Sequence, residues 1–242
     1  HGERAERQER QRPPREERQP RAEQAEAVQD EALPNEEQLQ DDEQDNNDGE
    51  RPRRRSRGQR RRSNRRERQR DADGNLIVAD AYKGLLSIDP QGAIKVLATE
   101  ADGLPFAFTD DLDIASDGRI YFSDASSRFQ QPDYLLDLLE GRPYGRLMVF
   151  DPASGKTQVL LKDLYFANGV ALSADEDFVL VNETYRYRIT RYWLKGDKAG
   201  QHDIFIDNLP GLPDNLQGDR KGTFWVALPT PRKADADFLH RH

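Results

Sequence analysis

Short apolar runs recur throughout residues 71–242, and turn-forming pairs such as Asp-Gly, Asn-Gly and Pro-Asp separate them. Runs of this length between such turns are typical of β-strands. One stretch, YLLDLLE at 134–140, has the pattern of a helix instead. The pattern therefore predicts an all-β domain with ten strands, at 75–79, 85–88, 94–97, 120–123, 147–150, 158–161, 178–182, 189–194, 203–206 and 223–227.

The strand pattern is organised in four repeats. Each repeat opens with an acidic turn that precedes a strand, in DADGNLIVAD, ASDGRIYFSD, SADEDFVLVN and GDRKGTFWVA. Asp73, Asp117, Asp175 and Asp219 mark these turns at spacings of 44, 58 and 44 residues, and an insertion at 126–145 explains the long middle spacing. A period of about 40–45 residues with four strands per repeat predicts a β-propeller.

Residues 1–70 differ from the rest of the chain in composition. They hold 19 Arg and 18 acidic residues but no Phe, Tyr, Trp, Ile or Met. Such a segment cannot bury enough apolar surface to offset the entropy of ordering its backbone. We therefore predict a disordered, charge-segregated tail at 1–70 and a folded domain at 71–242.

An arginine block at 51–70, with 12 Arg against one acidic residue, ends this tail. Dense arginine attracts phosphate backbones and releases their counterions, and its planar guanidinium groups suit RNA phosphates. The alternative is that this block folds back on the acidic block at 23–50 and only solvates a linker. The first interpretation predicts RNA binding by Arg53, Arg54, Arg55, Arg57, Arg60, Arg61, Arg62, Arg65 and Arg66.

Several classes of site are excluded by the composition. The sequence has no cysteine, so disulfides, thiolate metal sites and cysteine nucleophiles are absent. No apolar run approaches the length of about 18 residues that a transmembrane helix needs, and the Glu/Arg-rich N-terminus lacks the apolar stretch of a signal peptide. His1 in place of Met indicates a fragment or a processed chain.

The string GERPRRRSRGQRRRSNRRERQRDADGN at 49–75 resembles the arginine-rich scaffold region of bacterial ribonuclease E. The resemblance covers most of residues 1–75 and none of that enzyme's catalytic domain. It implies RNA binding or degradosome scaffolding, and a cytoplasmic protein. The segment DADGN at 71–75 fits both this tail and the start of a propeller strand, which is what a mis-joined or chimeric chain would show.

The strings DLYFANGVALSADEDFVLVNETYRYRITRYWLKG, NLPGLPDNLQ and FWVALPTPR resemble the strictosidine synthase-like proteins. These proteins share a six-bladed superfamily with gluconolactonase and the senescence marker protein, and the resemblance covers about 71–230. Six blades of about 40–45 residues need about 250 residues, whereas residues 71–242 number 172. The resemblance therefore implies a partial six-bladed β-propeller of about three and a half blades.

The same resemblance implies a calcium site. Calcium-dependent members hold one Ca²⁺ in the central tunnel with hard oxygen ligands, and the ion polarises a lactone or ester carbonyl or activates a water. Asn168 in ANGVALS and Asp214 in LPDNLQ match metal-binding and catalytic positions, with Asn215 beside the latter. Asp110 in FTDDLDIASDG matches a further ligand position. The remaining family ligand, a Glu from the first blade, has no counterpart in this sequence.

Other interpretations of these residues stay open at the level of sequence. Asn-Gly and Pro-Asp-Asn are also ordinary turn sequences. Glu183 can act as an acid/base group or form a strand-end salt bridge with Arg186 or Arg188. Trp193 and Trp225 fall in strand patterns and are expected in the core.

Three functions follow as competing hypotheses. The first is a fragment of a calcium-dependent hydrolase of a small lactone or ester. The second is an RNA-binding or scaffold protein that acts through the arginine block, and the third is a non-functional chimera. Strictosidine synthase activity is not assigned, because its catalytic glutamate comes from a later blade that this sequence lacks. The substrate, the compartment and the oligomeric state are not determined by the sequence.

Overall fold

The structure of the chain is a computed structural model that describes residues 69–233. The tail predicted to be disordered, residues 1–70, lies outside this range except for its last two residues. All nine arginines predicted to bind RNA also lie outside it. No helix in the described range is both long and apolar enough to cross a membrane.

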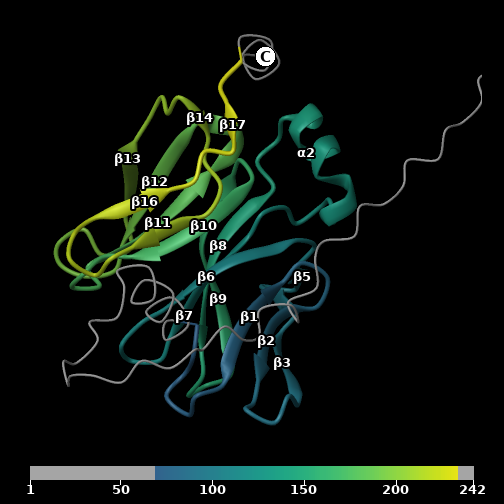
Figure 1. The fold of residues 1–242 in the computed structure, drawn as a ribbon, viewed down its shortest axis with the longest axis vertical. Helices are drawn as coiled ribbons and strands as arrows, with labels where there is room; N and C mark the ends of the chain where they lie inside the picture. The colour runs from purple at the N-terminus through teal and green to yellow at the C-terminus, as the bar shows by residue number, and fades with distance from the viewer. Residues whose placement is uncertain (1–68, 234–242) are drawn as a thin grey trace, which may run out of the picture. The chain divides into compact units, whose positions relative to one another are not determined.

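Two complete four-stranded antiparallel sheets form the centre of the described region (Figure 1). In each sheet the strands pair in chain order, so each sheet is a meander. The first contains β6 (Thr109–Ile114), β7 (Ile120–Asp124), β8 (Gly145–Asp151) and β9 (Lys156–Leu164). The second contains β10 (Ala167–Leu172), β11 (Phe178–Glu183), β12 (Arg188–Trp193) and β13 (His202–Ile206).

A three-stranded sheet precedes them and consists of β1 (Leu76–Asp80), β2 (Gly84–Ile88) and β3 (Ile94–Ala98). A bridge between Arg70 and Leu76 extends this sheet on the side of β1. The Arg70–Leu76 bridge is equivalent to the Ile114–Ile120 pair that joins the first two strands of the next sheet, since five residues separate the partners in both cases. The three strands are therefore equivalent to the second, third and fourth strands of the complete sheets.

The chain continues into a further sheet through short strands. β15 (Leu216–Gly218) pairs with β16 (Phe224–Val226), and β14 (Gly211–Leu212) pairs with β17 (Thr230–Pro231). A second small hairpin, β4 (Glu100–Ala101) with β5 (Leu104–Pro105), connects the first sheet to β6. The described residues thus contain two complete repeats flanked by two partial ones.

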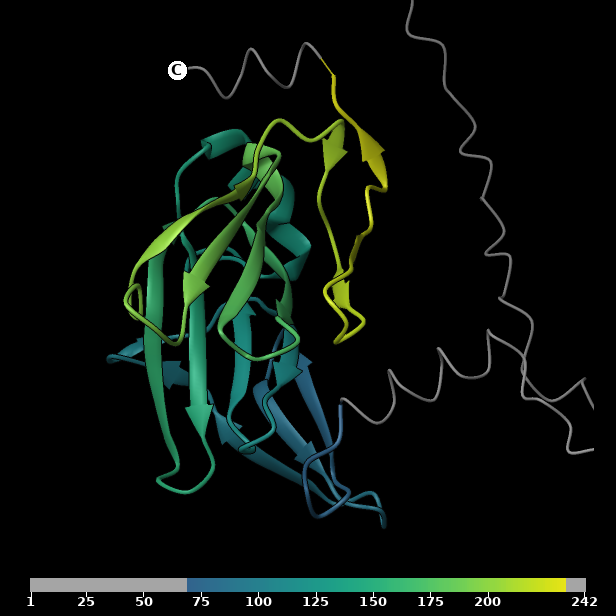
Figure 2. The same ribbon diagram turned by 90° about the vertical axis from the view of Figure 1, so that its left-hand side faces the viewer.

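β10 lies between the inner strands β6 and β15, and β1 lies beside β6. Figure 2 shows the region turned by 90°, with the last strands of the chain in yellow along one side. Apolar side chains from facing sheets fill the space between the sheets. One cluster joins the first two sheets and includes Ile77, Leu85 and Phe122, and another joins the two complete sheets and includes Leu147 and Val181. This packing fixes the inner strands as the wall of a common centre.

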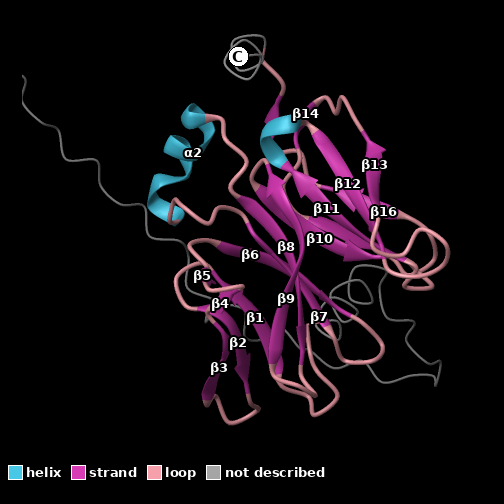
Figure 3. Cartoon of the chain, turned by 180° about the vertical axis from the view of Figure 1, so that it is seen from behind, coloured by secondary structure: helices cyan, strands magenta, loops and turns pink. Residues whose placement is uncertain are grey.

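The only α-helix in the described range, α2 (Tyr134–Glu140), lies in the insertion between β7 and β8 (Figure 3). It ends at Gly141, whose φ of 63° gives the left-handed cap that glycine accepts without strain. Asp137 points inward and is buried, while Tyr134, Leu135, Leu136 and Leu139 are exposed. The predicted helix and the predicted insertion are both confirmed.

The all-β class and the ten predicted strands are confirmed, with end points that shift by a few residues. The sequence pattern did not predict the inner strands β6, β10 and β15, or the short strands β4, β5, β14 and β17. The expectation that both tryptophans lie in the core is wrong. Trp225 is 47% exposed and Trp193 is only half-buried.

Candidate functional site

Three of the four residues predicted as metal ligands have equivalent places along three successive inner strands, two of them within a strand and Asp214 two residues before one. Asp110, Asn168 and Asp214 each lie four residues before the last residue of β6, β10 and β15, respectively. Because the inner strands lie side by side and run in the same sense from this point, equivalent positions come to one end of the common centre. The fold is thus compatible with the predicted convergence of one residue from each repeat, which stays a prediction.

A β-bulge presents the first two of these residues. Between Thr109 and Leu112, β6 has one residue more than its partner β7, and β10 has the same extra residue between Ala167 and Val170. A bulge interrupts the alternation of side chains and re-aims the residues within it. Asp110 and Asn168 fall inside these two bulges, so neither follows the inward and outward alternation of its strand.

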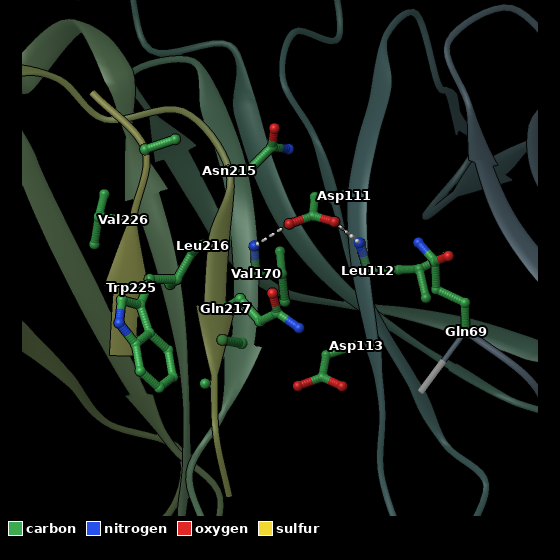
Figure 4. A pocket seen from close by; sticks show the side chains of 13 residues that line it. Gln69, Asp111, Leu112, Asp113, Val170, Asn215, Leu216, Gln217, Trp225 and Val226 are labelled. Atoms are coloured by element: carbon green, nitrogen blue, oxygen red, sulfur yellow. Dashed lines mark hydrogen bonds between the residues drawn. The ribbon is translucent and has the colours of Figure 1, made fainter. Parts of the chain in front are cut away.

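Two carboxylates set the alignment of β6 against β10. Asp111 accepts a hydrogen bond from the backbone N–H of Val170 at 3.0 Å (Figure 4). Asp113 accepts one from the backbone N–H of Leu172 at 2.9 Å. Each carboxylate satisfies a backbone donor of the next inner strand, which has no ladder partner on that side. These two bonds bring the bulge of β6 level with the bulge of β10.

Close backbone contact brings the third residue to the same place. The N–H of Gly169 donates to the carbonyl of Asp214 at 3.2 Å. A Cβ atom at Gly169 would lie 2.3 Å from the nitrogen of Leu216, so only glycine permits this approach. The side-chain amide of Asn182 also donates to the carbonyl of Asp214, and Thr184 donates to the carbonyl of Pro213 at 2.7 Å.

Burial and negative charge act together on Asp110. Burial, together with the carboxylates of Asp111 and Asp214, raises the pKa of Asp110 from 3.8 to about 8. A cation at this position would favour the charged form of both carboxylates.

Buried oxygens without hydrogen-bond partners surround the same position. Asn168 Oδ1, Asn182 Oδ1 and Thr109 Oγ1 are all inaccessible to solvent and unpartnered. An unpaired buried acceptor destabilises the fold by about 1–3 kcal/mol. Here the unpaired acceptors are in Asn168, in Thr109 next to Asp110, and in Asn182, which donates to the carbonyl of Asp214. A bound cation coordinated by Asn168 Oδ1 would remove one of these costs.

The donor set fits Ca²⁺ in chemistry. It offers two carboxylates and one amide oxygen, which are the hard oxygen ligands that calcium prefers. Calcium takes about 6–8 oxygens, so the rest of the shell must come from waters, substrate or atoms outside the described residues. Within residues 69–233 no three His, Cys, Asp or Glu side chains group closely enough to hold a metal by themselves.

A cavity of about 390 Å³ opens along the inner strands, and Asp111 and Asn215, the sequence neighbours of Asp110 and Asp214, line it (Figure 4). Asp111, Asp113 and Gln217 supply its polar wall, and Trp225 and Val226 supply its apolar wall. Asn215, predicted to assist Asp214, is exposed and lines the cavity. A cavity of this size with mixed walls suits a small organic molecule.

The other end of the inner strands is closed by Arg220. Its guanidinium donates to Asp113 at 2.9 Å, to the carbonyl of Ile114 at 3.0 Å and to Glu176 at 3.3 Å. Glu176 also accepts from the backbone N–H of Ser116 at 2.7 Å. This network ties together the turns of three successive sheets and leaves the candidate ligands at the opposite end.

Sequence reasoning missed Asp111, Asp113, Asn182 and Arg220. The acidic pattern DDLD predicts one ligand, Asp110, and carries no local signal for the contacts of Asp111 and Asp113. Nothing in the sequence linked Asn182 or Arg220 to partners more than thirty residues away. Glu183 forms the strand-end salt bridge that the sequence allows, with Arg188 as its partner at 2.8 Å.

Comparison with known proteins shows a family profile and several relatives to which the described region is similar. Residues 110–197 match the profile of the strictosidine synthase family. The chain is 51% identical over 157 residues to strictosidine synthase-like protein 10 of Arabidopsis thaliana, a match that covers 64% of this chain and 42% of the relative. It is 44% identical over 176 residues to the adipocyte plasma membrane-associated protein of Homo sapiens, covering 69% of this chain and 42% of the relative. The chain thus spans less than half the length of these relatives.

Solved structures give the fold. A gluconolactonase from Xanthomonas campestris superposes with a TM-score of 0.53 at 23% identity, covering 66% of this chain and 54% of that one. A calcium-binding protein, regucalcin, from Agrobacterium tumefaciens gives a TM-score of 0.51 at 20% identity, covering 66% and 52%. The predicted partial β-propeller and the resemblance to strictosidine synthase-like proteins are confirmed. The predicted resemblance of the tail to ribonuclease E concerns residues outside the described range and stays a prediction.

Proposed function

We propose that the parent activity of this propeller is calcium-dependent hydrolysis of a small lactone or ester. One observation carries the proposal: Asp110 in β6, Asn168 in β10 and Asp214, two residues before β15, lie equally far from the last residue of three successive inner strands. Their oxygens match the chemistry of calcium, and the buried Asn168 Oδ1 lacks any other partner. Without a cation this buried amide oxygen would stay unpaired, at a cost of about 1–3 kcal/mol.

Each residue has a distinct part in this proposal. Asp214 and Asp110 supply the negative charge that attracts the cation, and Asn168 supplies a neutral oxygen whose direction its bulge fixes. When bound, calcium would polarise the carbonyl of the substrate or lower the pKa of a water. The adjacent cavity would hold the substrate, with Gln217 and Asn215 as hydrogen-bonding groups and Trp225 as an apolar surface.

The similar structures support this choice of chemistry without deciding it. One is a gluconolactonase, and another is a calcium-binding protein. Both are below 25% identity to this chain, so they speak for the shared fold. The donor set and the cavity support a cation beside a small molecule, and the choice of a lactone or ester rests on the resemblance to the calcium-dependent members of the superfamily.

A direct test uses the full chain and a panel of lactones and esters. Hydrolysis should appear with excess calcium and disappear with chelator. Calorimetric titration should show calcium binding. Asp214→Asn should abolish both, whereas Asp203→Asn, which removes a carboxylate on the outer strand β13, should keep both. Calcium binding without hydrolysis of any panel member would leave a metal-binding propeller and exclude the proposed activity.

A further inference from the structure

Two buried carboxylates, Asp124 and Glu183, lie opposite the two bulges that carry candidate ligands. Asp124 ends β7 and pairs across the ladder with Thr109, and Glu183 ends β11 and pairs with Ala167. Both are fully buried, at 0% exposure. They hold the same position in successive sheets, and neither belongs to the candidate ligand set.

Each of these carboxylates accepts hydrogen bonds from the segment that leads into the bulge. Asp124 Oδ1 accepts from the backbone N–H of Phe108 at 2.9 Å and of Ala107 at 3.3 Å. Glu183 Oε2 accepts from the backbone N–H of Tyr165 at 3.1 Å. In each sheet the bonded residues lie two or three positions before the candidate ligand.

Backbone contacts repeat the same arrangement in both sheets. The N–H of Ala125 donates to the carbonyl of Phe108 at 2.7 Å, and the N–H of Thr184 donates to the carbonyl of Phe166 at 3.2 Å. The rings of Phe108 and Phe166 also touch each other edge to face, with centroids 5.6 Å apart. The two entry segments are therefore fixed both to their own sheets and to one another.

An arginine on the third strand of each sheet completes the arrangement. Arg146 binds Asp124 at 2.6 Å, and Arg188 binds Glu183 at 2.8 Å. Each arginine stands directly opposite its carboxylate in the strand ladder. Thr190 donates a further hydrogen bond to Glu183 at 2.6 Å. A buried carboxylate is tolerated only with such partners, so each pair keeps a charged acceptor in place beneath a bulge.

We infer that these two ion pairs, each with a buried carboxylate, are positioning pairs, which hold the bulges of β6 and β10 in the shape that presents Asp110 and Asn168 to a cation. The inference rests on the calcium site of the proposed function. The same device is built with Asp in one sheet and Glu in the next, so the arrangement is shared although the side chain differs. Loosening either pair should weaken cation affinity without removing a ligand.

The test is Glu183→Gln in the full chain, measured by calorimetric calcium titration and by backbone hydrogen exchange. The substitution keeps the size of the side chain but removes its charge and one of its two acceptor oxygens. We expect calcium affinity to fall by roughly 10–100-fold, as is typical when a residue that supports a metal ligand is changed. Exchange should rise at 165–169 and stay unchanged at 107–111. Asp124→Asn should give the reverse pattern of exchange.

Two control variants separate positioning from general destabilisation. Asp203→Asn removes the carboxylate of another Asp–Arg pair of the same sheet, in which Arg191 and Asp203 lie 2.8 Å apart. Val179→Ala leaves a cavity in the same strand as Glu183 and lowers the stability of the fold. Both should bind calcium within about twofold of the unchanged protein at temperatures well below unfolding, because neither touches an entry segment.

The outcomes are distinguishable. If Glu183→Gln binds calcium as tightly as the unchanged protein, the inference is wrong while the calcium site stands. If the unchanged protein binds no calcium, the proposed function fails, and exchange at 165–169 then decides the anchoring role alone. Unchanged exchange there in Glu183→Gln overturns the inference, and a local rise supports it. Should Asp124→Asn not fold, Glu183→Gln suffices, since Arg188 is partly exposed and can reach solvent.

Discussion

Asp113 accepts a hydrogen bond from the backbone N–H of Leu172 at 2.9 Å, across 59 residues of sequence. Its other oxygen accepts from Arg220 at 2.9 Å. One carboxylate in β6 therefore joins β10 to the turn that follows β15. The alignment of three inner strands, and with it the convergence of the candidate ligands, depends on this buried acid.

Replacement of Arg220 by Ala should destabilise the fold. Asp113 would lose its cationic partner while its carboxylate stays buried, and the loss of one member of such a pair is costly. Because Arg220 is partly exposed, we expect a decrease of about 2 kcal/mol in the free energy of unfolding. Denaturant unfolding measures it. Arg119→Ala is the control, since the Arg119–Asp117 pair is about half exposed and should contribute less than about 1 kcal/mol.

Replacement of Gly169 by Ala should disturb the site more than its small size suggests. The new methyl group would lie 2.3 Å from Leu216 N and 2.6 Å from the carbonyl of Asp214, and both are backbone atoms that cannot move alone. We expect a loss of roughly 2–3 kcal/mol of stability and weaker calcium binding. Gly92→Ala has no atom within 4 Å and should cost only the strain of its positive φ, about 1 kcal/mol, with calcium binding unchanged.

Replacement of Asn168 by Leu should separate calcium binding from folding. Leucine has a similar volume and removes the unpaired buried oxygen, so the calcium-free protein should unfold at a temperature no lower than before. The increase in unfolding temperature that calcium gives to the unchanged protein should disappear. Thermal unfolding with calcium and with chelator measures both effects. A full calcium shift in Asn168→Leu would remove this residue from the ligand set.

Stability of the calcium-free protein should decrease as pH rises from about 4 to about 8. The pKa of Asp110 is raised from 3.8 to about 8, so the folded state holds this proton more tightly than the unfolded state. Its stabilising contribution is complete below pH 3.8 and is lost as pH rises through about 8. Asp110→Asn should flatten this part of the profile.

Excess calcium should reverse the sign of that dependence. The cation competes with the proton for Asp110, so apparent calcium affinity should rise with pH until this carboxyl group is ionised. The check is calcium titration at pH 6 and pH 9, values on either side of the pKa of about 8. Equal affinity at both would show that Asp110 is not a ligand.

The sequence by itself determined the repeat, the outer strands and the helix at 134–140. These elements depend on local apolar patterns and turn chemistry, and in them the pattern agrees with the fold. Together with the resemblance to known propellers, the sequence also named Asp110, Asn168 and Asp214. It could not show that the three residues occupy equivalent positions in neighbouring strands.

Only the tertiary structure decided the inner strands and the arrangement of the site. Segments such as TDDLDI and ANGVAL read as turns, because Asp and Asn-Gly disfavour strands when only local preference acts. In the fold, polar groups of these segments form hydrogen bonds with residues distant in the sequence. The Asp111 carboxylate accepts from the backbone N–H of Val170, and the N–H of Gly169 donates to the carbonyl of Asp214. Such partners come together only when the sheets pack, so no local sequence pattern can predict them.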